Sequence, residues 1–395
     1  MSKAFVCPYC FSRQDLYQIQ FRCQNDPTRC APADDEPYAR FIGLTNRSLK
    51  MNRVFDYQGS KRRVPRRAPC DHCGEYSSRR VCPACHNELP YTIGDFQDLI
   101  ISVIGAKESG KSHYISVLIH MIENKVGRAF NCNLQKLDDN TIRKYREEFY
   151  NPVFRNHTVI PETRSARGDY NVKMPMVFSL SFMRKNLLGR ARIHKLSTIS
   201  FFDTAGEDLN SEDTMRNENK YIFNSSGIIL LIDPLQLPNV RNQLSSHGVA
   251  LPYMNTETED IIARVAKLIR NGLQIPANKL IEIPLAVAFS KIDAIAPLLD
   301  SHSALFTPPG HEGFYNVSDG RAIHAEIENM LAQWAGEDLL LKVEQNFRHH
   351  AFFGLSALGC NPHGSTRIEK LRPHRVSDPF LWLLYRNKVI KGKKN

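Results

Sequence analysis

Residues 99–112 constrain the fold more than any other part of the chain, because an apolar run there leads into the pattern GxxxxGK[ST]. Gly105 and Gly110 allow the backbone to curl until its N–H groups point at phosphates, and Lys111 places a positive charge between them. The hydroxyl of Ser112 is suited to ligate Mg²⁺. The apolar run predicts a buried strand, and the residues after the loop predict a helix whose N-terminus faces the phosphates. The pattern therefore predicts a nucleoside triphosphate site. The other residues expected in it are Glu108, Ser109 and His113.

Length and composition indicate an ordinary globular protein with a large core. The chain has 395 residues, of which 42% are hydrophobic and 24% charged. This is enough for one large domain and a small appendage, which we place at residues 96–395 and 1–95. The first residues lack the apolar core of a secretion signal, and no apolar run approaches the length of a membrane span. These features predict a cytoplasmic protein with no membrane contact.

Cysteines are concentrated in the first 85 residues, which hold eight of the ten. Three pairs have the Cys-x-x-Cys spacing with which two thiolates bind one tetrahedral zinc ion. Zinc is favoured over disulfides because a protein of this class is expected in a reducing compartment. We predict two zinc ions with a structural role, since four thiolates leave no coordination position open for a substrate. The compact set is Cys70, Cys73, Cys82 and Cys85, and the second set is Cys7, Cys10, Cys23 and Cys30.

The pairing of these cysteines could also interleave, with Cys7 and Cys10 sharing an ion with a later pair. His72 and His86 lie beside the knuckles and are expected to face solvent rather than to replace a ligand. The two cysteines outside this segment are expected to be buried thiols: Cys132 and Cys360.

The net charge of +11 is divided between the first 95 residues and the rest of the chain. The densest basic run, residues 61–67, lies just before Cys70. It predicts either contact with RNA, DNA or an acidic partner, or a solvated loop. The basic residues at 388–394 are expected to be solvated.

A second motif follows two predicted strands. Residues 176–182 alternate as in a half-buried strand and residues 193–202 return as another, which predicts an antiparallel hairpin. The second strand ends in Asp203-Thr-Ala-Gly206-Glu207. Asp203 would hold Mg²⁺ through water, and Gly206 would let a backbone N–H reach the γ-phosphate.

Further along, residues 227–233 predict another core strand and residues 258–270 an amphipathic helix. A third apolar run, residues 280–289, leads into Ser290-Lys-Ile-Asp293. A carboxylate at a strand end can accept both N–H groups of a guanine edge, while the stem of Lys291 covers the base. Adenine lacks this donor pair and would be rejected.

Together with Ser356, Ala357 and Leu358, these motifs resemble the phosphate, switch, base-specificity and base-backing motifs of GTPases. The hairpin before Asp203 is similar to that of the TRAFAC class. The resemblance implies an α/β fold of the P-loop NTPase type, a Ras-like GTPase with a mostly parallel sheet and one antiparallel hairpin, preceded by a small zinc-ribbon-like domain. The cysteine-rich front and residues 377–384 resemble the bacterial double-GTPase group of conflict and defence systems.

Three positions depart from the family pattern. Ser290 stands where relatives usually have Asn or Thr, which affects the contact that ties this loop to the phosphate loop. Glu207 stands where Ras-like enzymes have a glutamine that orients water, and a carboxylate can still bind that water. The switch threonine is either Thr163 or Thr158. Two residues are candidates for an internal arginine finger: Arg164 and Arg167.

The resemblance implies a switch that binds guanine nucleotides and hydrolyses GTP to GDP with Mg²⁺, slowly without a partner. Lys111, Glu207, Gly206 and Thr163 would carry the catalysis. A regulatory or effector protein would read the switch, in a regulatory or defence role. Two alternatives stay open: a zinc-ribbon nucleic-acid-binding or adaptor protein whose nucleotide domain controls assembly, and an ATPase.

Overall fold

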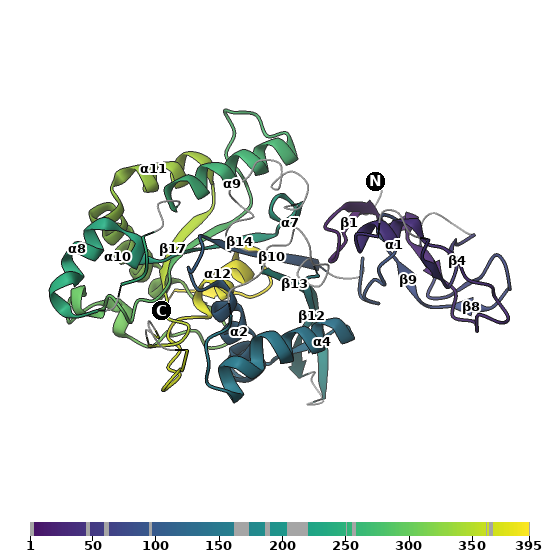
Figure 1. Cartoon of the computed structure of the whole chain (residues 1–395), viewed down its shortest axis with the longest axis horizontal. Coiled ribbons are helices and arrows are strands. Elements are labelled where there is room, and N and C mark those ends of the chain that lie inside the picture. Colours follow the sequence, from purple (N-terminus) through teal and green to yellow (C-terminus); the bar gives the residue numbers. More distant parts are fainter. Residues whose placement is uncertain are drawn as a thin grey trace.

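The fold is described from a computed structural model of the chain. A seven-stranded mixed sheet forms its centre, with the strand order β11-β12-β13-β10-β14-β15-β17 (Figure 1). The strands are β10 (Gln97–Gly105), β11 (Cys132–Lys136), β12 (Met176–Lys185), β13 (Ala191–Asp203), β14 (Gly227–Ile232), β15 (Leu285–Phe289) and β17 (His350–Gly354). The residues described are 4–44, 48–58, 63–94, 97–161, 174–185, 190–203, 220–249, 251–254, 258–360, 362 and 366–394.

The direction of the strands confirms the predicted α/β fold. β10 pairs in parallel with both β13 and β14, and β15 and β17 continue the parallel part of the sheet. β12 pairs with β13 in the antiparallel direction, as the hairpin prediction required. β11 adds an antiparallel strand to the outer edge of β12, which the sequence analysis did not anticipate. The chain therefore has a mostly parallel sheet with an antiparallel hairpin and one further antiparallel strand at its edge.

Both faces of the sheet are covered, which explains why its central strands are apolar throughout. Leu99, Ile101 and Val103 of β10 face one core, while Ile100 and Ile104 face the other. The first core is covered by α2 (Lys111–Met121), the helical segment η3 (Tyr145–Arg155) and α12 (Asp378–Arg386). The short helix α4 (Asp139–Lys144) leads into η3 and contacts β12. The second is covered by α7 (Lys220–Phe223), α8 (Pro238–Leu244), α9 (Thr258–Leu273), α10 (Val317–Ala335) and α11 (Glu337–Asn346).

The cysteine-rich segment before β10 consists of very short strands. β3 (Gln20–Arg22) pairs with β6 (Val54–Asp56) on one side and β9 (Arg80–Val81) on the other, both antiparallel. In Figure 1 this purple segment lies beside the sheet, near the labels of β13 and β12. The remaining elements of the segment are β1 (Ala4–Val6), β2 (Arg13–Asp15), η1 (Leu16–Gln18), β4 (Ala33–Asp34), α1 (Glu36–Phe41), β5 (Lys50–Met51), β7 (Ala68–Pro69) and β8 (Tyr76–Ser77).

Several short elements complete the chain. Near the C-terminus, β18 (Gly392–Lys393) pairs in parallel with β16 (Tyr315–Asn316). Among the described residues, no helix is both long and apolar enough to cross a membrane. The other short helical segments are η2 (Ile122–Val126), α3 (Gly127–Phe130), η5 (Pro234–Gln236), η6 (Ser245–His247), η7 (Ala296–Leu298) and η8 (Ala304–Phe306).

Candidate functional site

The predicted phosphate loop connects the central strand β10 to α2. A Cβ atom at Gly105 would lie 2.5 Å from the carbonyl oxygen of Leu231 on β14, so the loop must start with glycine. Gly110 has φ 88° and precedes α2, where it brings no side chain that could cap the helix. The N-terminus of α2 is thus built like an anion-binding helix end.

The ammonium group of Lys111 already lies over this loop. Lys111 is buried, and its Nζ donates to the carbonyl oxygens of Gly105 at 3.0 Å and Ala106 at 2.9 Å. These carbonyl groups hold the positive charge beside the loop. The next residue, Ser112, lies in the first turn of α2. The arrangement can neutralise the charge of an anion bound at the helix N-terminus.

The other predicted motifs begin at the same edge of the sheet. The strand register places Asp203 beside Val103, Leu231 beside Gly105 and Phe289 beside Ile232. The carboxyl ends of parallel strands are where ligands bind in open α/β sheets. Six predicted residues lie outside the described part of the chain, or have undescribed side chains: Thr163, Arg164, Arg167, Asp203 (side chain only), Gly206 and Glu207. The rival switch residue Thr158 is described, and its hydroxyl donates to the carbonyl oxygen of Pro152 at 3.4 Å.

The predicted base-recognition residues come together. The hydroxyl of Ser356 donates to the carboxylate of Asp293 and accepts from the N–H of Gly359 at 2.8 Å. Burial raises the pKa of Asp293 above its ordinary value, and the bond from Ser356 opposes this shift. Leu358 is buried and Ala357 half-buried beside them. A carboxylate held from one side by Ser356 is suited to accept N–H groups from a planar base.

Ser290 and Lys291 connect this loop to β14. The Ser290 hydroxyl donates to the carbonyl oxygen of Ile232 at 3.2 Å. The Nζ atom of Lys291 lies 2.7 Å from the carboxylate of Asp233, whose side chain is buried while that of Lys291 is about a third exposed at 29%. The short side chain of Ser290 therefore ties the base motif to the neighbouring strand.

His113 takes part in a different contact from the one expected. Its Nε2 accepts the backbone N–H of Ile160 at 2.9 Å. Burial, assisted by the charge of Lys291, lowers the pKa of His113 to about 4. The imidazole is consequently neutral at physiological pH and can accept this bond. It holds the chain just before the residues in which the switch threonine was predicted.

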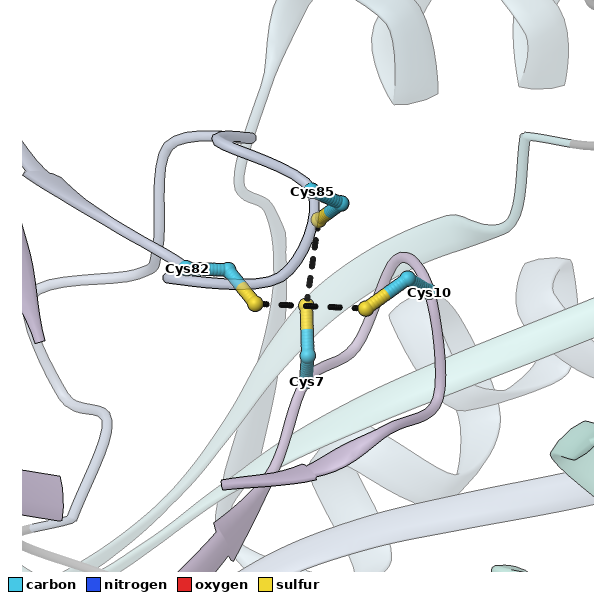
Figure 2. A group of neighbouring side chains, drawn as sticks. All are labelled: Cys7, Cys10, Cys82 and Cys85. Atoms are coloured by element: carbon cyan, nitrogen blue, oxygen red, sulfur yellow. Dashed lines mark hydrogen bonds between the residues drawn. The ribbon is translucent and has the colours of Figure 1, made fainter. Parts of the chain in front are cut away.

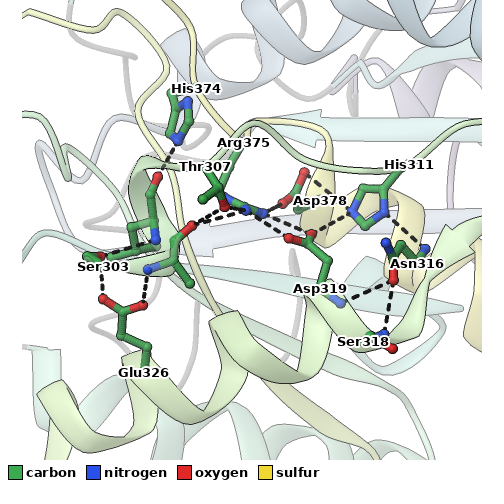
Figure 3. A network of polar contacts seen from close by, with 12 residues as sticks. Ser303, Thr307, His311, Asn316, Ser318, Asp319, Glu326, His374, Arg375 and Asp378 are labelled. Carbon is green, nitrogen blue, oxygen red and sulfur yellow. Dashed lines mark hydrogen bonds and ion pairs between the residues drawn. The ribbon is translucent and has the colours of Figure 1, made fainter. Parts of the chain in front are cut away.

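A buried ionic network, absent from the sequence predictions, is centred on Arg375 (Figure 3). Arg375, fully buried, donates to Asp319 at 2.9 and 3.0 Å and to Asp378 at 2.8 Å. The preceding residue, His374, exchanges both backbone hydrogen bonds with Ser356. The network thus anchors the base loop to α10 and α12.

The charges of this network compensate one another. His311, Asp319 and Asp378 have ligand atoms within 4.8 Å of one another, but the guanidinium of Arg375 supplies the positive charge they need. Burial raises the pKa of Asp378 to about 7, although Arg375 favours its ionised form. Burial lowers the pKa of His311 to about 4. The only sequence signal for this network was an arginine and an aspartate three residues apart.

The eight N-terminal cysteines form two groups of four. Within each group the four Sγ atoms lie within 4.8 Å of one another, and nearest pairs are separated by 3.6–4.0 Å. Tetrahedral zinc with Zn–S bonds of about 2.3 Å places its sulfur ligands about 3.8 Å apart. The proximal tetrad consists of Cys7, Cys10, Cys82 and Cys85 (Figure 2), and the distal tetrad of Cys23, Cys30, Cys70 and Cys73.

The favoured assignment of ligands from the sequence was therefore wrong, and the interleaved alternative is confirmed. The cause is the antiparallel pairing of β3 with β9, in which Gln20 lies opposite Val81. Cys23 follows the end of β3 and Cys82 the end of β9, so the two cysteines leave the ladder at opposite ends. Cys70 and Cys73 lie at the same end of the ladder as Cys23. The chain then returns along β9 to the other end, where Cys82 meets Cys7.

The surroundings of both tetrads fit zinc thiolates. The Nδ2 of Asn87 donates to the sulfur of Cys85 at 3.2 Å, and backbone N–H groups donate to Cys82 and Cys23, each at 3.4 Å. Burial raises the pKa of Cys7, so that a bound cation is needed to keep its thiolate. Either tetrad would hold its ion with four protein ligands, as structural zinc sites do.

Three further cysteine and histidine predictions need correction. The side chain of His86 is only 12% exposed, and its Nδ1 lies 2.6 Å from Asp35, which also pairs with Arg22. The expectation that His86 faces solvent was wrong, because this buried pair holds it inside. His72 is exposed, as predicted. Two thiols are half-buried rather than fully buried: Cys132 and Cys360.

Comparison with known proteins gives distant similarities. No family model matches the chain. It is 26% identical over 324 residues to SaeC of Mycolicibacterium smegmatis, provisionally named an ESX-1 scaffolding and assembly protein, covering 77% of this chain and 78% of that one. The Arl6 BBS3 small GTPase of Trypanosoma brucei is 12% identical, with a TM-score of 0.31 over 75% of this chain and 100% of its own. The Ski7 GTPase-like domain of S. cerevisiae is 14% identical, with the same TM-score over 75% and 51%.

Proposed function

We propose that this chain is a molecular switch that binds GTP and hydrolyses it to GDP and phosphate with Mg²⁺. The observation that carries the proposal is the meeting of two motifs at one edge of the sheet. A buried Lys111 lies over a glycine loop at a helix N-terminus, and the carboxylate of Asp293, which accepts a hydrogen bond from Ser356, would bind the base. The first motif would bind the phosphates of a nucleotide, and the second would bind its base.

In this function each residue has a defined role. Lys111 and the N–H groups of α2 would neutralise the β- and γ-phosphates, exchanging the carbonyl contacts of Lys111 for phosphate oxygens. Ser112 and Asp203 would hold Mg²⁺, which supplies charge neutralisation when bound. Asp293 would accept the N–H groups of guanine, with Lys291 covering the base.

The residues that would act on the attacking water remain predictions. We propose Glu207 for orienting the water, Gly206 for sensing the γ-phosphate and Thr163 for closing over Mg²⁺. Hydrolysis that depends on a carboxylate in place of glutamine is expected to be slow without a protein partner. The division into a zinc-binding domain (1–95) and a nucleotide domain (96–395) is likewise proposed.

The biological role is proposed from the SaeC similarity. The similarity covers more than three quarters of both chains, and SaeC is named a scaffolding and assembly protein. This favours a switch that controls the assembly of other proteins. The cytoplasmic location and the defence role implied by the family resemblance stay predictions.

The first test is a titration of the zinc-replete protein with fluorescent GTP and ATP analogues in Mg²⁺, together with phosphate release. We expect preference for guanine and slow release. Asp293→Asn should abolish GTP binding and allow xanthosine triphosphate to bind, because an amide N–H matches the additional carbonyl of xanthine. Asp300→Asn, at an exposed position, serves as the control. Equal binding of ATP and GTP by the parent protein would refute the proposal.

A second candidate function, nucleic-acid binding, has one observation in its favour. An open depression of 510 Å³ beside the distal tetrad is lined in part by Arg29, Arg67 and Tyr76. Tyr76 is 61% exposed. Arginines with an exposed ring suit single-stranded nucleic acid.

Binding of single-stranded RNA and DNA over a series of salt concentrations tests this candidate. Phosphate contacts would give a steep loss of affinity with salt, and Tyr76→Ala would weaken binding. Arg143→Ala on α4 is the control for general charge effects. An absence of binding at low salt would exclude this function.

A further inference from the structure

Phe11 joins the proximal tetrad to the sheet. It directly follows the first cysteine knuckle, has φ 55° and is only 4% exposed. Its ring lies 5.5 Å from that of Phe202 in an edge-on arrangement and 5.8 Å from that of Tyr221. The rings of Phe202 and Tyr221 are 4.4 Å apart. The three rings form a buried aromatic contact between the knuckle and the nucleotide fold.

Both partners of Phe11 belong to elements that position the nucleotide motifs. Phe202 is the last residue before Asp203 and lies beside Ser102 in the sheet. The hydroxyl of Ser102 donates to the carbonyl oxygen of Tyr221 at 3.4 Å. Ser102 is three residues before Gly105 on the strand that leads into the phosphate loop. A displacement of Phe11 would therefore shift the ends of β13 and β10.

The same knuckle is also connected to β12, the other strand of the hairpin. Tyr9 donates to the carboxylate of Asp138 at 3.0 Å, and Asp138 caps α4 by accepting the N–H of Thr141. The hydroxyl of Thr141 accepts the N–H of Val177 on β12 at 2.9 Å. Val177 in turn shares a hydrophobic core with Cys7 of the proximal tetrad. The knuckle is thus packed against both strands of the hairpin.

We propose that the proximal tetrad is energetically coupled to the nucleotide site, with Phe11 as the positioning residue, so that zinc and nucleotide each strengthen the binding of the other. This inference rests on the proposed nucleotide binding. Coupling between two sites is reciprocal, and typical coupling changes affinity about 5- to 150-fold. The distal tetrad is expected to show much weaker coupling, since its described core residues all precede residue 74 and it meets the proximal core through Val64 rather than through the sheet.

The test measures zinc release from the full-length protein to a colorimetric chelator, with and without saturating Mg²⁺–GDP. Variants that retain one tetrad assign the signal: Cys23→Ser with Cys73→Ser leaves the proximal site, and Cys10→Ser leaves the distal site. We expect nucleotide to slow release from the proximal tetrad at least fivefold and to leave the distal rate unchanged. Lys111→Ala, whose nucleotide affinity should be at least about 100-fold lower, is expected to lose the protection at the nucleotide concentration that saturates the parent protein.

Phe11→Ala should reduce the protection at least threefold, and Phe11→Leu should retain part of it. Phe55→Leu, a buried aromatic change in the distal core, is the matched control and should leave protection unchanged. Fluorescent GDP binding is measured on the same samples. Binding without protection of the proximal zinc, or equal protection of both ions, overturns the coupling alone. Absence of GDP binding overturns both the proposed function and the coupling that rests on it.

Discussion

The proximal and distal tetrads have the same four ligands and similar sulfur separations, yet they lie in different surroundings. The proximal tetrad shares its hydrophobic core with Met174 and Val177, at the beginning of the hairpin. The distal tetrad packs against Phe21 and Phe55 within its own small segment. Ligand chemistry alone therefore does not determine which part of the protein a metal site stabilises. The elements packed around the site determine whether the metal supports a local knuckle or the whole fold.

Removal of one ligand from each tetrad tests this comparison most strongly. Structural zinc contributes about 10 kcal/mol or more to the folding of small domains. Cys85→Ser should remove one of the two zinc ions and lower the melting temperature of the nucleotide fold. Cys70→Ser should also remove one ion but leave that melting transition in place. Zinc content and thermal unfolding are measured together, with Cys132→Ser as the control. Equal destabilisation by the two variants would contradict the difference between the tetrads.

Lys111→Ala tests whether the coupling between the regions depends on nucleotide rather than on packing. Lys111 bonds to the carbonyl oxygens of its own loop, so its loss should leave both zinc ions bound. Nucleotide affinity should fall at least about 100-fold, or about 2.8 kcal/mol. Fluorescence titration and zinc analysis check the two statements. Zinc loss in this variant would show that the two regions cannot be separated.

Acidification should weaken guanine recognition at the base end of the site, away from both tetrads. Burial raises the pKa of Asp293, and only its ionised carboxylate would accept the guanine N–H groups. Protons therefore compete with guanine, and affinity falls as the pH decreases toward this raised pKa, approaching tenfold per pH unit below it. The ratio of GTP to ATP affinity between pH 8 and pH 5 removes the contribution of phosphate protonation.

The same ratio should be unchanged in Cys70→Ser, since the distal tetrad does not contact this end. A ratio that rises as the pH falls in the parent protein would show that the ionised carboxylate of Asp293 does not bind the base.

Two tyrosine substitutions test the difference between the proximal and distal segments through smaller changes in unfolding free energy. Tyr9 donates to the charged carboxylate of Asp138, while Tyr57 in the distal segment donates to the carbonyl oxygen of Tyr17 at 3.1 Å. Hydrogen bonds to charged groups contribute about 1.5–3 kcal/mol and neutral ones about 0.5–1.5 kcal/mol. Tyr9→Phe should therefore cost more unfolding free energy than Tyr57→Phe in chemical denaturation. The reverse order would contradict the closer attachment of the proximal knuckle.

The fold of the central sheet was predictable because its signals are local. The glycine loop, the apolar strand before it and the alternation of the hairpin each depend on neighbouring residues, and each prediction was confirmed as a structural element. The ligand pairs of the tetrads were not predictable from spacing. Cys73 and Cys82 are close in sequence, but the antiparallel ladder of β3 and β9 separates them. Strand pairing in segments of two or three residues leaves little periodicity to read.

Long-range contacts of single side chains were also hidden. Phe11 reads as one more aromatic residue in a zinc knuckle until Phe202 and Tyr221 are placed around it. Arg375 and Asp319 are charged residues, which are usually exposed. The packing of α10 against the C-terminal segment buries Arg375 and leaves the side chain of Asp319 only 16% exposed. The base residues Asp293 and Ser356 were predicted separately. Their direct hydrogen bond depends on β15 and β17 being neighbours in the sheet.

The two tetrads are nested along the chain, because residues 23–73 lie between the two halves of the proximal set. During synthesis the ligands of the distal tetrad are complete before Cys82 has been made. Once the distal ion has closed its loop, the proximal knuckles have a shorter flexible path to span, which lowers the entropy cost of bringing Cys7 to Cys85. The partners of Phe11 follow more than a hundred residues later. Binding of the distal metal would therefore help the nascent chain to form the proximal site, and the proximal knuckle would be folded before the strands of the sheet pack against it.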